Sequence, residues 1–182
     1  IIEGNLIKTN NIIIDSKSGY SGAGKKFDLK NIISLDDQNF YNYNTNTHRH
    51  ICEIKQELDK YSNLKVSFSF NPHILPNYRG MMSTLYCDLK SNIRHEDIIN
   101  KLENYYKHSP FVNIAKDNKS FDFFAIQKTN NCLIKIFNHH SNNKIIIVSL
   151  IDNLLKGAAG QAVQCFNKFF NFNESTSLIN LK

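Results

Sequence analysis

The sequence predicts an α+β domain in which helices cover a mixed, largely antiparallel sheet. Short runs of β-branched and aromatic residues between turn signals indicate strands, and other segments repeat their apolar residues at helical spacing. Because several strands follow one another with few helices between them, antiparallel pairing is favoured. Only seven glycines and three prolines occur in 182 residues, so regular elements should dominate.

The expected strands are residues 12–14, 66–70, 81–89, 121–128, 133–138 and 145–150. Residues 66–70 alternate apolar side chains with serines, which is typical of a half-buried strand. Asn71-Pro72 and Pro76-Asn77 should bracket a turn region after it. The asparagine-rich residues 39–47 are interpreted as a loop.

Three helices are expected from apolar side chains that share one face. The first should begin at Thr47, which can cap it, and the second should span His95–Tyr106. The third closes the chain after a cap by Asp152 or Asn153. The apolar stripes are, in order, Ile51, Ile54, Leu58 and Tyr61; Ile98, Ile99, Leu102 and Tyr106; and Leu155, Ala159, Ala162, Phe166 and Phe170.

The net charge of +6 and the pI near 9.1 suit an anionic partner. The basic residues are scattered, however, and no run of four Lys or Arg occurs, so we expect no nucleic-acid binding. A phosphorylated substrate or cofactor would use the same positive charge. No apolar run approaches the roughly 20 residues that cross a bilayer, so we expect no membrane span.

The cysteines Cys52, Cys87, Cys132 and Cys165 are widely spaced and form no CxxC pair. That spacing favours neither a zinc site nor a secreted disulfide framework, so no metal is expected. No signal peptide is visible, although the chain begins without Met at Ile1. These features predict a soluble cytoplasmic domain.

Residues 18–25 (SGYSGAGK) form a glycine-rich loop after a strand. Glycine lets backbone N–H groups converge on an anion, and the spacing fits the opening of a P-loop. A P-loop would continue with Ser or Thr to hold magnesium and then with a regular helix. Here Lys26 follows Lys25, and residues 27–35 lack helical periodicity, so a plain turn between strands remains an equal alternative.

Residues 47–53 (THRHICE) contain candidates for acid–base chemistry. Glu53 lies three residues after His50 and shares its helix face, where a carboxylate can orient an imidazole. His48 should point away from Glu53. The alternative is an exposed polar cluster at a helix start. Cys52 falls near the apolar stripe and is expected in the core.

Residues 152–164 (DNLLKGAAGQAVQ) place four small residues, 157–160, at the start of a helix. Such a thin surface admits either a flat cofactor or a closely packed helix. Asn153 offers an amide to a ligand or caps the helix.

Together, in this order and spacing, these segments resemble the catalytic and dimerisation domain of the N-acetyl-gamma-glutamyl-phosphate reductase family, which has a semialdehyde dehydrogenase-like fold. Residues 69–80 (SFNPHILPNYRG) supply a fourth match, and the resemblance covers essentially the whole chain. Two departures are that Lys25 stands where the family has Arg, and Ile51-Cys52 where it has Thr-Pro.

The resemblance implies reduction of N-acetyl-gamma-glutamyl phosphate to N-acetylglutamate semialdehyde with NADP as cofactor, in arginine biosynthesis. A cysteine thiolate would attack the acyl phosphate to give a thioester, which hydride transfer then reduces. The family's cysteine stands in an Asn-Pro-Gly-Cys setting that this chain lacks. We therefore expect the nucleophile and an N-terminal Rossmann domain upstream, an inactive isolated chain and four structural cysteines.

By the same resemblance, the catalytic residues are His50 as base, Glu53 as its orienting group and His48. The cofactor-binding residues are Ser21, Gly22, Asn153 and Gly157, and the substrate-binding residues are Ser18 and Arg79. Alternatives are an aspartate-semialdehyde dehydrogenase-type enzyme and a non-catalytic dimerisation module. A P-loop would instead bind magnesium and ATP.

Residues 1–151 are expected to form the catalytic and dimerisation domain, assembling as a homo-oligomer (dimer or tetramer). Residues 152–182 would form a C-terminal helix at the border with the missing Rossmann domain. There, Phe166, Phe169 and Phe170 should be incompletely buried, and Asn153 should keep its side chain free for the cofactor.

Overall fold

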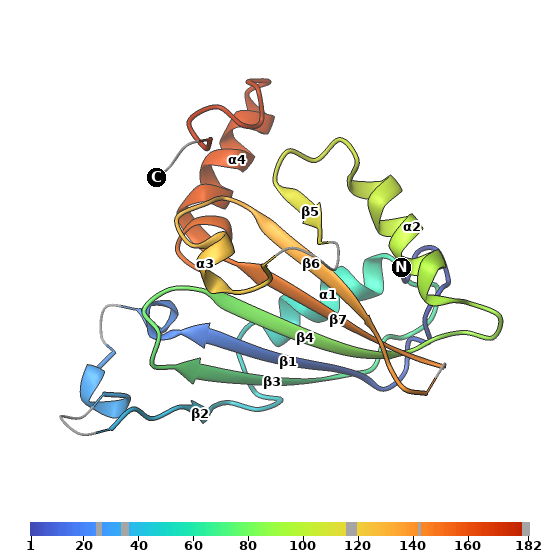
Figure 1. Ribbon diagram of the computed structural model, residues 1–182, viewed down its shortest axis with the longest axis horizontal. Coiled ribbons are helices and arrows are strands. Elements are labelled where there is room, and N and C mark those ends of the chain that lie inside the picture. Colours follow the sequence, from blue (N-terminus) through green and yellow to red (C-terminus); the bar gives the residue numbers. More distant parts are fainter. Residues whose placement is uncertain (25–26, 34–36, 116–119, 142, 180–182) are drawn as a thin grey trace.

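The computed structural model describes residues 1–24, 27–33, 37–115, 120–141 and 143–179. In this part of the chain a seven-stranded sheet has the order β2-β3-β1-β4-β7-β6-β5 (Figure 1). The strands are β1 (Ile12–Gly19), β2 (Tyr41–Asn42), β3 (Phe68–Leu75), β4 (Met81–Asp88), β5 (Val112–Ile114), β6 (Cys132–Asn138) and β7 (Lys144–Ile151). β1 and β3 are parallel, as are β5 and β6, and the other neighbours are antiparallel. The predicted mixed, largely antiparallel sheet is confirmed.

The helices are α1 (Ile51–Lys60), α2 (His95–Tyr106), the short α3 (Phe123–Ile126) and α4 (Gly160–Phe169). Two 3-10 turns, η1 (Tyr20–Ala23) and η2 (Leu29–Asn31), follow β1, and a π-helical turn, η3 (Leu155–Ala159), precedes α4. α2 has the predicted bounds. None of the described helices is both long and apolar enough to cross a membrane.

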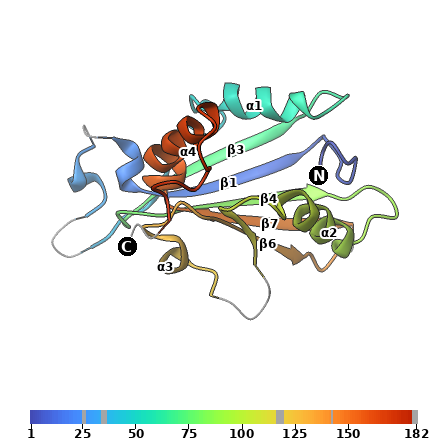
Figure 2. The ribbon, with the colours of Figure 1, turned by 90° about the horizontal axis from the view of Figure 1, so that it is seen from above.

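The sheet has two unlike faces. Along β1, Ile12, Ile14 and Ser16 are buried, whereas the residues between them are more exposed. The buried side, called the helix face below, packs against the apolar stripes of α1 and α2. Figure 2 shows α1 on one side of the sheet and α3 on the other. The second side, called the open face, carries Ile13, Asp15 and Lys17 of β1 and their register partners on β3 and β4.

One predicted strand is a helix. Residues 121–128 contain α3, which begins after Asp122, whose carboxylate accepts a 3.1 Å hydrogen bond from the Ala125 N–H. An aspartate at this position is a strong helix cap, and it outweighs the aromatic content that favoured a strand.

The turn predicted at Asn71-Pro72 is also absent, because β3 continues to Leu75. The Pro72 carbonyl accepts a 3.0 Å hydrogen bond from the Tyr43 N–H, so the missing N–H of Pro72 lies on the same side, towards β2. β2 pairs only with His73 and Ile74, and no ladder bond is therefore lost at the proline. The predicted strand at 12–14 likewise extends to Gly19, and the three-residue β5 was not predicted.

Candidate functional site

The two histidines of the predicted catalytic set lie immediately before α1. The helix begins at Ile51 with His50 at its cap position, not at Thr47 as predicted. Residues 47–50 instead form turns, which Asn46 anchors to β3: its N–H donates to the Phe70 carbonyl at 2.9 Å, and its Oδ1 accepts from the Phe70 N–H at 2.8 Å. Asn46 has a φ of 56°, which asparagine tolerates better than most residues.

Both ring nitrogens of His48 are engaged. Its Nδ1 accepts a 3.2 Å hydrogen bond from the His50 backbone N–H, and its Nε2 lies 3.2 Å from the Tyr43 hydroxyl. The ring packs edge-on against Phe70, with centroids 5.5 Å apart. Burial lowers the pKa of His48, and the nearby His50 and Arg49 lower it further. His48 is therefore held as a neutral imidazole in a fixed orientation.

His50 is more open. Its Nε2 lies 4.0 Å from Glu53 Oε2, and the two side chains are 51% and 77% exposed. The shared face predicted from their spacing is confirmed, but 4.0 Å exceeds hydrogen-bond distance. The His50 ring is therefore open to a ligand at this position, beside the Glu53 carboxylate.

The cysteines divide into two kinds. Cys52 is exposed, not in the core as predicted, because Ile51, Ile54 and Leu58 fix which side of α1 faces the sheet. Cys165 is exposed as well. Burial raises the pKa of Cys87 to about 11 and also raises the pKa of Cys132. Those two thiols stay protonated near neutral pH and are unsuited to nucleophilic attack.

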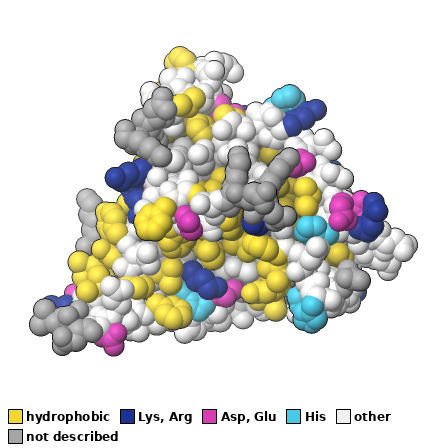
Figure 3. Space-filling model, viewed as in Figure 1, with side chains coloured by type: hydrophobic (Ala, Val, Ile, Leu, Met, Phe, Trp, Pro, Cys, Tyr) yellow, Lys and Arg dark blue, Asp and Glu magenta, His cyan; other side chains and the backbone are white. Residues whose placement is uncertain are grey.

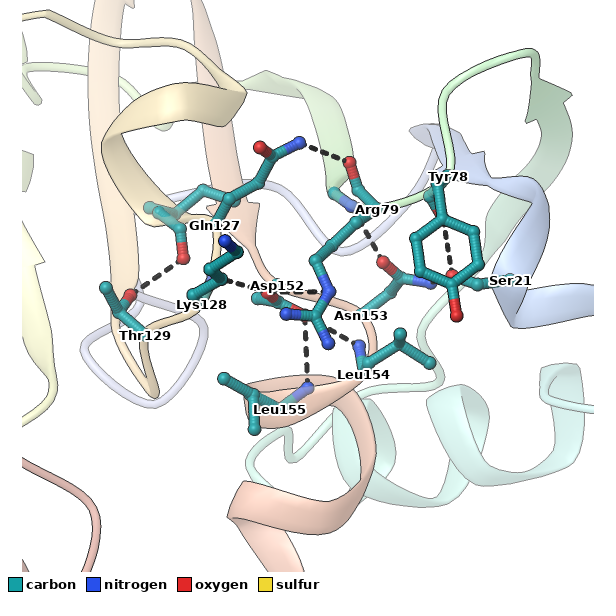
Figure 4. A network of polar contacts seen from close by, with 12 residues as sticks. Ser21, Tyr78, Arg79, Gln127, Lys128, Thr129, Asp152, Asn153, Leu154 and Leu155 are labelled. Atoms are coloured by element: carbon teal, nitrogen blue, oxygen red, sulfur yellow. Dashed lines mark hydrogen bonds and ion pairs between the residues drawn. The ribbon is translucent and has the colours of Figure 1, made fainter. Parts of the chain in front are cut away.

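A second group of predicted residues meets at the end of β1. The Asn153 amide nitrogen donates to Ser21 Oγ at 2.8 Å, while its Oδ1 accepts a 2.7 Å hydrogen bond from the Gly80 N–H (Figure 4). The Ser21 hydroxyl in turn donates to the Tyr78 carbonyl. Asn153 is only 9% exposed, so the prediction of a free side chain is wrong. Its amide instead connects η1, the β3–β4 turn and the segment after β7.

Ser18, Gly22 and Gly157 adjoin this amide. A Cβ built on Gly22 would lie 3.0 Å from Ser18 Oγ and 3.5 Å from Asn153 Nδ2. A Cβ on Gly157 would lie 3.8 Å from the Asn153 Cβ. The structure thus brings together all the predicted cofactor residues and Ser18.

The P-loop alternative receives no support. The glycine-rich loop ends β1 and forms the turn η1. The described residues 27–33 contain the turn η2 and a bridge from Ile33 to Gln38, but not the α-helix that a P-loop needs. The comparison with the P-loop motif also depended on Lys25 and Lys26, which lie outside the described residues.

Asp152 is the centre of a further network that sequence reasoning did not find. It is fully buried, at 0% exposure. Its carboxylate accepts hydrogen bonds from the N–H groups of Leu154 (2.9 Å), Leu155 (3.1 Å) and Lys128 (2.7 Å). Asp152, not Asn153, therefore satisfies the first N–H groups of the closing helical segment. The sequence offered Asp152 only as a possible cap.

Arg79, predicted to bind substrate, pairs with this buried carboxylate. Its Nε lies 3.4 Å from Asp152 Oδ2, and its carbonyl accepts a 2.9 Å hydrogen bond from Gln127 Nε2 (Figure 4). The next residue, Gly80, has a φ of 116°, and a Cβ there would meet the Phe123 ring at 2.7 Å. Only glycine fits at this point of the turn. The glycine after Arg79 is therefore the sequence signal for the tight turn that places Arg79.

The histidine group and the Asn153 group lie on the same face of the sheet but are separate. Ser18 pairs in register with Ile74, four residues along β3 from Phe70, which supports His48. At roughly 3.3 Å per residue along a strand, these two positions on β3 are about 13 Å apart. No hydrogen bond or ion pair joins the two groups among the residues that the structure describes. Nor do those residues include three or more His, Cys, Asp or Glu placed to hold a metal ion.

The aromatic end of α4 is exposed as expected. Phe166, Phe169 and Phe170 are 54%, 80% and 54% exposed, and Phe170 contacts the other two rings at centroid distances of 4.6 Å and 5.0 Å. The incomplete burial of these rings is confirmed.

Comparison with known proteins identifies relatives in two ways. The family model described as semialdehyde dehydrogenase, dimerisation domain, matches residues 1–153. Curated relatives named N-acetyl-gamma-glutamyl-phosphate reductase include those of Clostridium botulinum (strain Alaska E43 / Type E3), 40% identical over 95% of this chain and 50% of that protein, and Acinetobacter baylyi, 43% identical with the same coverage. A protein of Arabidopsis thaliana, named as the probable chloroplastic enzyme, is 37% identical over 98% of this chain and 45% of its own length.

Solved structures agree on the fold. Aspartate semialdehyde dehydrogenase from Francisella tularensis has a TM-score of 0.68 at 16% identity, covering 93% of this chain and 60% of that one. Aspartate semialdehyde dehydrogenase II of Vibrio cholerae, complexed with ASA, has a TM-score of 0.67 at 16% identity, covering 88% and 55%. The chain spans about half the length of the curated relatives it matches. It belongs to the semialdehyde dehydrogenase dimerisation domain family.

Proposed function

We propose that this chain is the substrate-facing and subunit-pairing part of an NADP-dependent reductase that converts N-acetyl-gamma-glutamyl phosphate to N-acetylglutamate semialdehyde. The observation that carries the proposal is the histidine pair before α1. His48 is fixed at both ring nitrogens, whereas His50 is open to a ligand. The relatives at 37–43% identity supply the substrate class.

In this proposal His50 is the acid–base group. It would remove the proton of the attacking thiol and return a proton when the thiohemiacetal collapses to the aldehyde. Glu53 would orient the His50 ring, and His48 fixes the backbone at His50 through the Nδ1 contact. The attacking cysteine would come from the upstream Rossmann domain. Cys87 and Cys132 are buried with raised pKa values, and the exposed Cys52 and Cys165 do not stand in the family's Asn-Pro-Gly-Cys setting.

The residues at the end of β1 fit a dinucleotide in part. Ser21, Gly22 and Gly157 present little side-chain bulk, as a flat nicotinamide ring needs, and NADP when bound would supply the hydride. The Asn153 amide, however, is engaged at both ends. We therefore assign Ser21, Gly22 and Gly157 to cofactor contact, and Asn153 to holding the loop that carries Ser21.

Ser18 and Arg79 remain the proposed substrate residues. Asp152 contacts Arg79 through Nε, so the terminal guanidinium nitrogens are the atoms proposed to meet an anionic group. The buried carboxylate would fix the direction of the guanidinium, since both partners are anchored to different loops.

We also propose that residues 152–182, of which 180–182 lie outside the described part, border the Rossmann domain, and that the enzyme works as a cytoplasmic homo-oligomer. The exposed rings of α4 support the border, and the family's description as a dimerisation domain supports self-association. An aspartate-semialdehyde dehydrogenase-type enzyme is the second candidate, on the fold likeness to those structures.

The test uses the full-length protein that contains this chain. Phosphate-dependent reduction of NADP⁺ would be followed with N-acetylglutamate semialdehyde and, in parallel, aspartate semialdehyde. We expect turnover with the acetylated substrate, and His50→Ala to lower kcat by about 10²- to 10⁴-fold, the usual range for a lost acid–base group. His48→Ala should lower kcat by a smaller factor. Preference for aspartate semialdehyde would establish the second candidate, and turnover by the 182-residue chain alone would disprove the upstream nucleophile.

A further inference from the structure

The side chain of Tyr43 borders the histidine group. Its hydroxyl lies 3.2 Å from His48 Nε2, and the two rings pack edge-on with centroids 5.4 Å apart. The Tyr43 N–H donates to the Pro72 carbonyl at 3.0 Å, so the backbone that carries the phenol is bound to β3. Because His48 packs against the buried Phe70, the pair lies at the helix face. Figure 3 shows the opposite, open face, where apolar side chains gather over the strands.

The hydrogen bonds of His48 determine which of its ring nitrogens carries the proton. The His50 backbone N–H can only donate, so His48 Nδ1, 3.2 Å away, must accept and cannot carry a proton. A doubly protonated ring would set two N–H groups against each other at Nδ1, and burial, which lowers the pKa of His48, also keeps the ring neutral. The proton of the neutral ring is therefore on Nε2, and this N–H donates to the Tyr43 oxygen.

The Tyr43 hydroxyl thus accepts from His48 and keeps its own proton to donate. Burial raises the pKa of Tyr43, so the phenol stays protonated near neutral pH. In the described part of the chain, no acceptor for this proton lies within hydrogen-bond distance. A hydroxyl that accepts one hydrogen bond donates the next more strongly, because hydrogen bonds in a chain polarise one another. This half-buried donor adjoins the His48 ring, whose centroid is 4.8 Å from that of His50.

Positive charge acts at the same position. The Arg49 guanidinium adds to the effect of burial in lowering the pKa of His48, and it opposes the rise that burial causes in the pKa of Tyr43. A donor hydroxyl and a cation close together favour an anionic oxygen, because a hydrogen bond to an ionised acceptor is stronger than one to a neutral acceptor. The substrates of the proposed reaction carry such oxygens in the phosphate and in the carboxylate of the semialdehyde.

We infer that Tyr43 is a substrate-binding residue, whose hydroxyl donates to an anionic oxygen of the substrate beside His50. This role rests on the function proposed above and adds to that site a residue that no motif indicated. His48 then acts on the substrate only through Tyr43 and through the backbone of His50, since both of its ring nitrogens are engaged. The oxygen belongs either to the phosphate or to the carboxylate, and the kinetics of one variant separate the two.

The experiment uses the full-length protein that contains this chain, in the phosphate-dependent reduction of NADP⁺ with N-acetylglutamate semialdehyde. Tyr43→Phe keeps the ring contacts and removes only the hydroxyl. Because a hydrogen bond to a charged group is lost, kcat/KM for one substrate should fall about 10- to 100-fold, almost entirely through KM. A raised KM for phosphate assigns the oxygen to phosphate, and a raised KM for the semialdehyde assigns it to the carboxylate. A lower kcat with both KM values unchanged would show that Tyr43 only orients His48, and would overturn the substrate contact.

Two further variants test the chemistry of the contact. Tyr105→Phe, the matched control, removes an exposed phenol hydroxyl on α2 and should leave both KM values unchanged. Arg49→Gln should raise the KM of the same substrate that Tyr43→Phe affects, because both side chains favour one anionic oxygen. If Arg49→Gln raises the KM of the other substrate alone, the assignment of an anionic oxygen at Tyr43 is overturned.

The proton on His48 is located by NMR in the 182-residue chain, independently of catalysis. In a long-range ¹H–¹⁵N correlation spectrum at about pH 7.5, where the imidazole is neutral, His48 should be protonated at Nε2 and not at Nδ1. Tyr43→Phe should shift the Nε2 signal more than the Nδ1 signal. Protonation at Nδ1 would mean that Tyr43 donates to His48, and it would overturn the inference.

A full-length wild type that turns over neither semialdehyde disproves the proposed function, and anion binding to the 182-residue chain then decides the role of Tyr43. Millimolar inorganic phosphate or acetate should shift the His48 Nε2 signal in the wild type and leave it unchanged in Tyr43→Phe. No shift with either anion in the wild type would overturn the inference.

Discussion

The Asn153 amide donates a 2.8 Å hydrogen bond to the Ser21 hydroxyl and so joins two segments 132 residues apart in the sequence. Because the other end of the amide accepts from the Gly80 N–H, one side chain holds three chain segments in place. The glycine-rich loop therefore depends for its position on a residue at the far end of the domain.

Asn153→Ala should lower the free energy of unfolding of the 182-residue chain by about 1–3 kcal/mol, because the buried Gly80 N–H loses its partner. Ser21→Ala should lower the free energy of unfolding by less. In a double-mutant cycle measured by urea denaturation, the two should couple by more than about 0.5 kcal/mol. Strict additivity would show that the hydrogen bond contributes nothing measurable.

Asp152→Ala should destabilise the chain by about 3–5 kcal/mol, since it leaves Arg79 without its partner and three backbone N–H groups unsatisfied. The matched control is Glu57→Ala, which removes an exposed ion pair with Lys60 at 3.8 Å and should cost at most about 1 kcal/mol. Equal losses in urea denaturation for the two variants would contradict the buried network.

His48 should make the chain less stable in mild acid. Its folded-state pKa is lowered below 6.5, so between the folded and unfolded pKa values the unfolded chain binds more protons. Stability from this residue is present above pH 6.5 and is lost as pH falls through that window. His48→Gln should flatten the difference in urea midpoint between pH 7.5 and 5.5. An NMR titration of His48 with a midpoint at or above 6.5 would contradict this.

Phe169, 80% exposed, should contribute little to the isolated chain but more to the full-length protein. Phe169→Ser should change the unfolding free energy of the 182-residue chain by no more than about 0.5 kcal/mol, as is usual at exposed sites. In the full-length protein the thermal midpoint should fall. No change in either protein would show that the Rossmann domain does not cover this ring.

Most of the strands, and the bounds of α2, could be predicted because the spacing of apolar residues along each segment determines which of its side chains are buried. The errors have local causes. Asp122 caps a short helix inside an aromatic run, and Pro72 is accepted within β3 because its neighbour β2 is only two residues long. Neither the cap nor the length of the neighbouring strand follows from periodicity.

The candidate site was predictable by residue type but not by contact. The motifs named Ser21, Gly22 and Asn153, yet whether the Asn153 amide faces a ligand or Ser21 depends on how β1 and β7 are placed in the sheet. No sequence pattern pointed to the contact between Tyr43 and His48. Tyr43 lies in an asparagine-rich stretch, and it reaches His48 only because Asn46 is bound to Phe70.

The strand order has a consequence for synthesis of the chain. β4 lies between β1 and β7, so the middle of the sheet combines the first strand of this sequence with the last. Two of the six ladders, those of β7 with β4 and with β6, close only after residue 151 is available, and pairings between strands so distant in the sequence form slowly. A nascent chain that stops short of β7 exposes β4 as an unpaired edge, with the attendant risk of aggregation. We expect the domain to depend on a chaperone during synthesis more than a helical protein of equal length does.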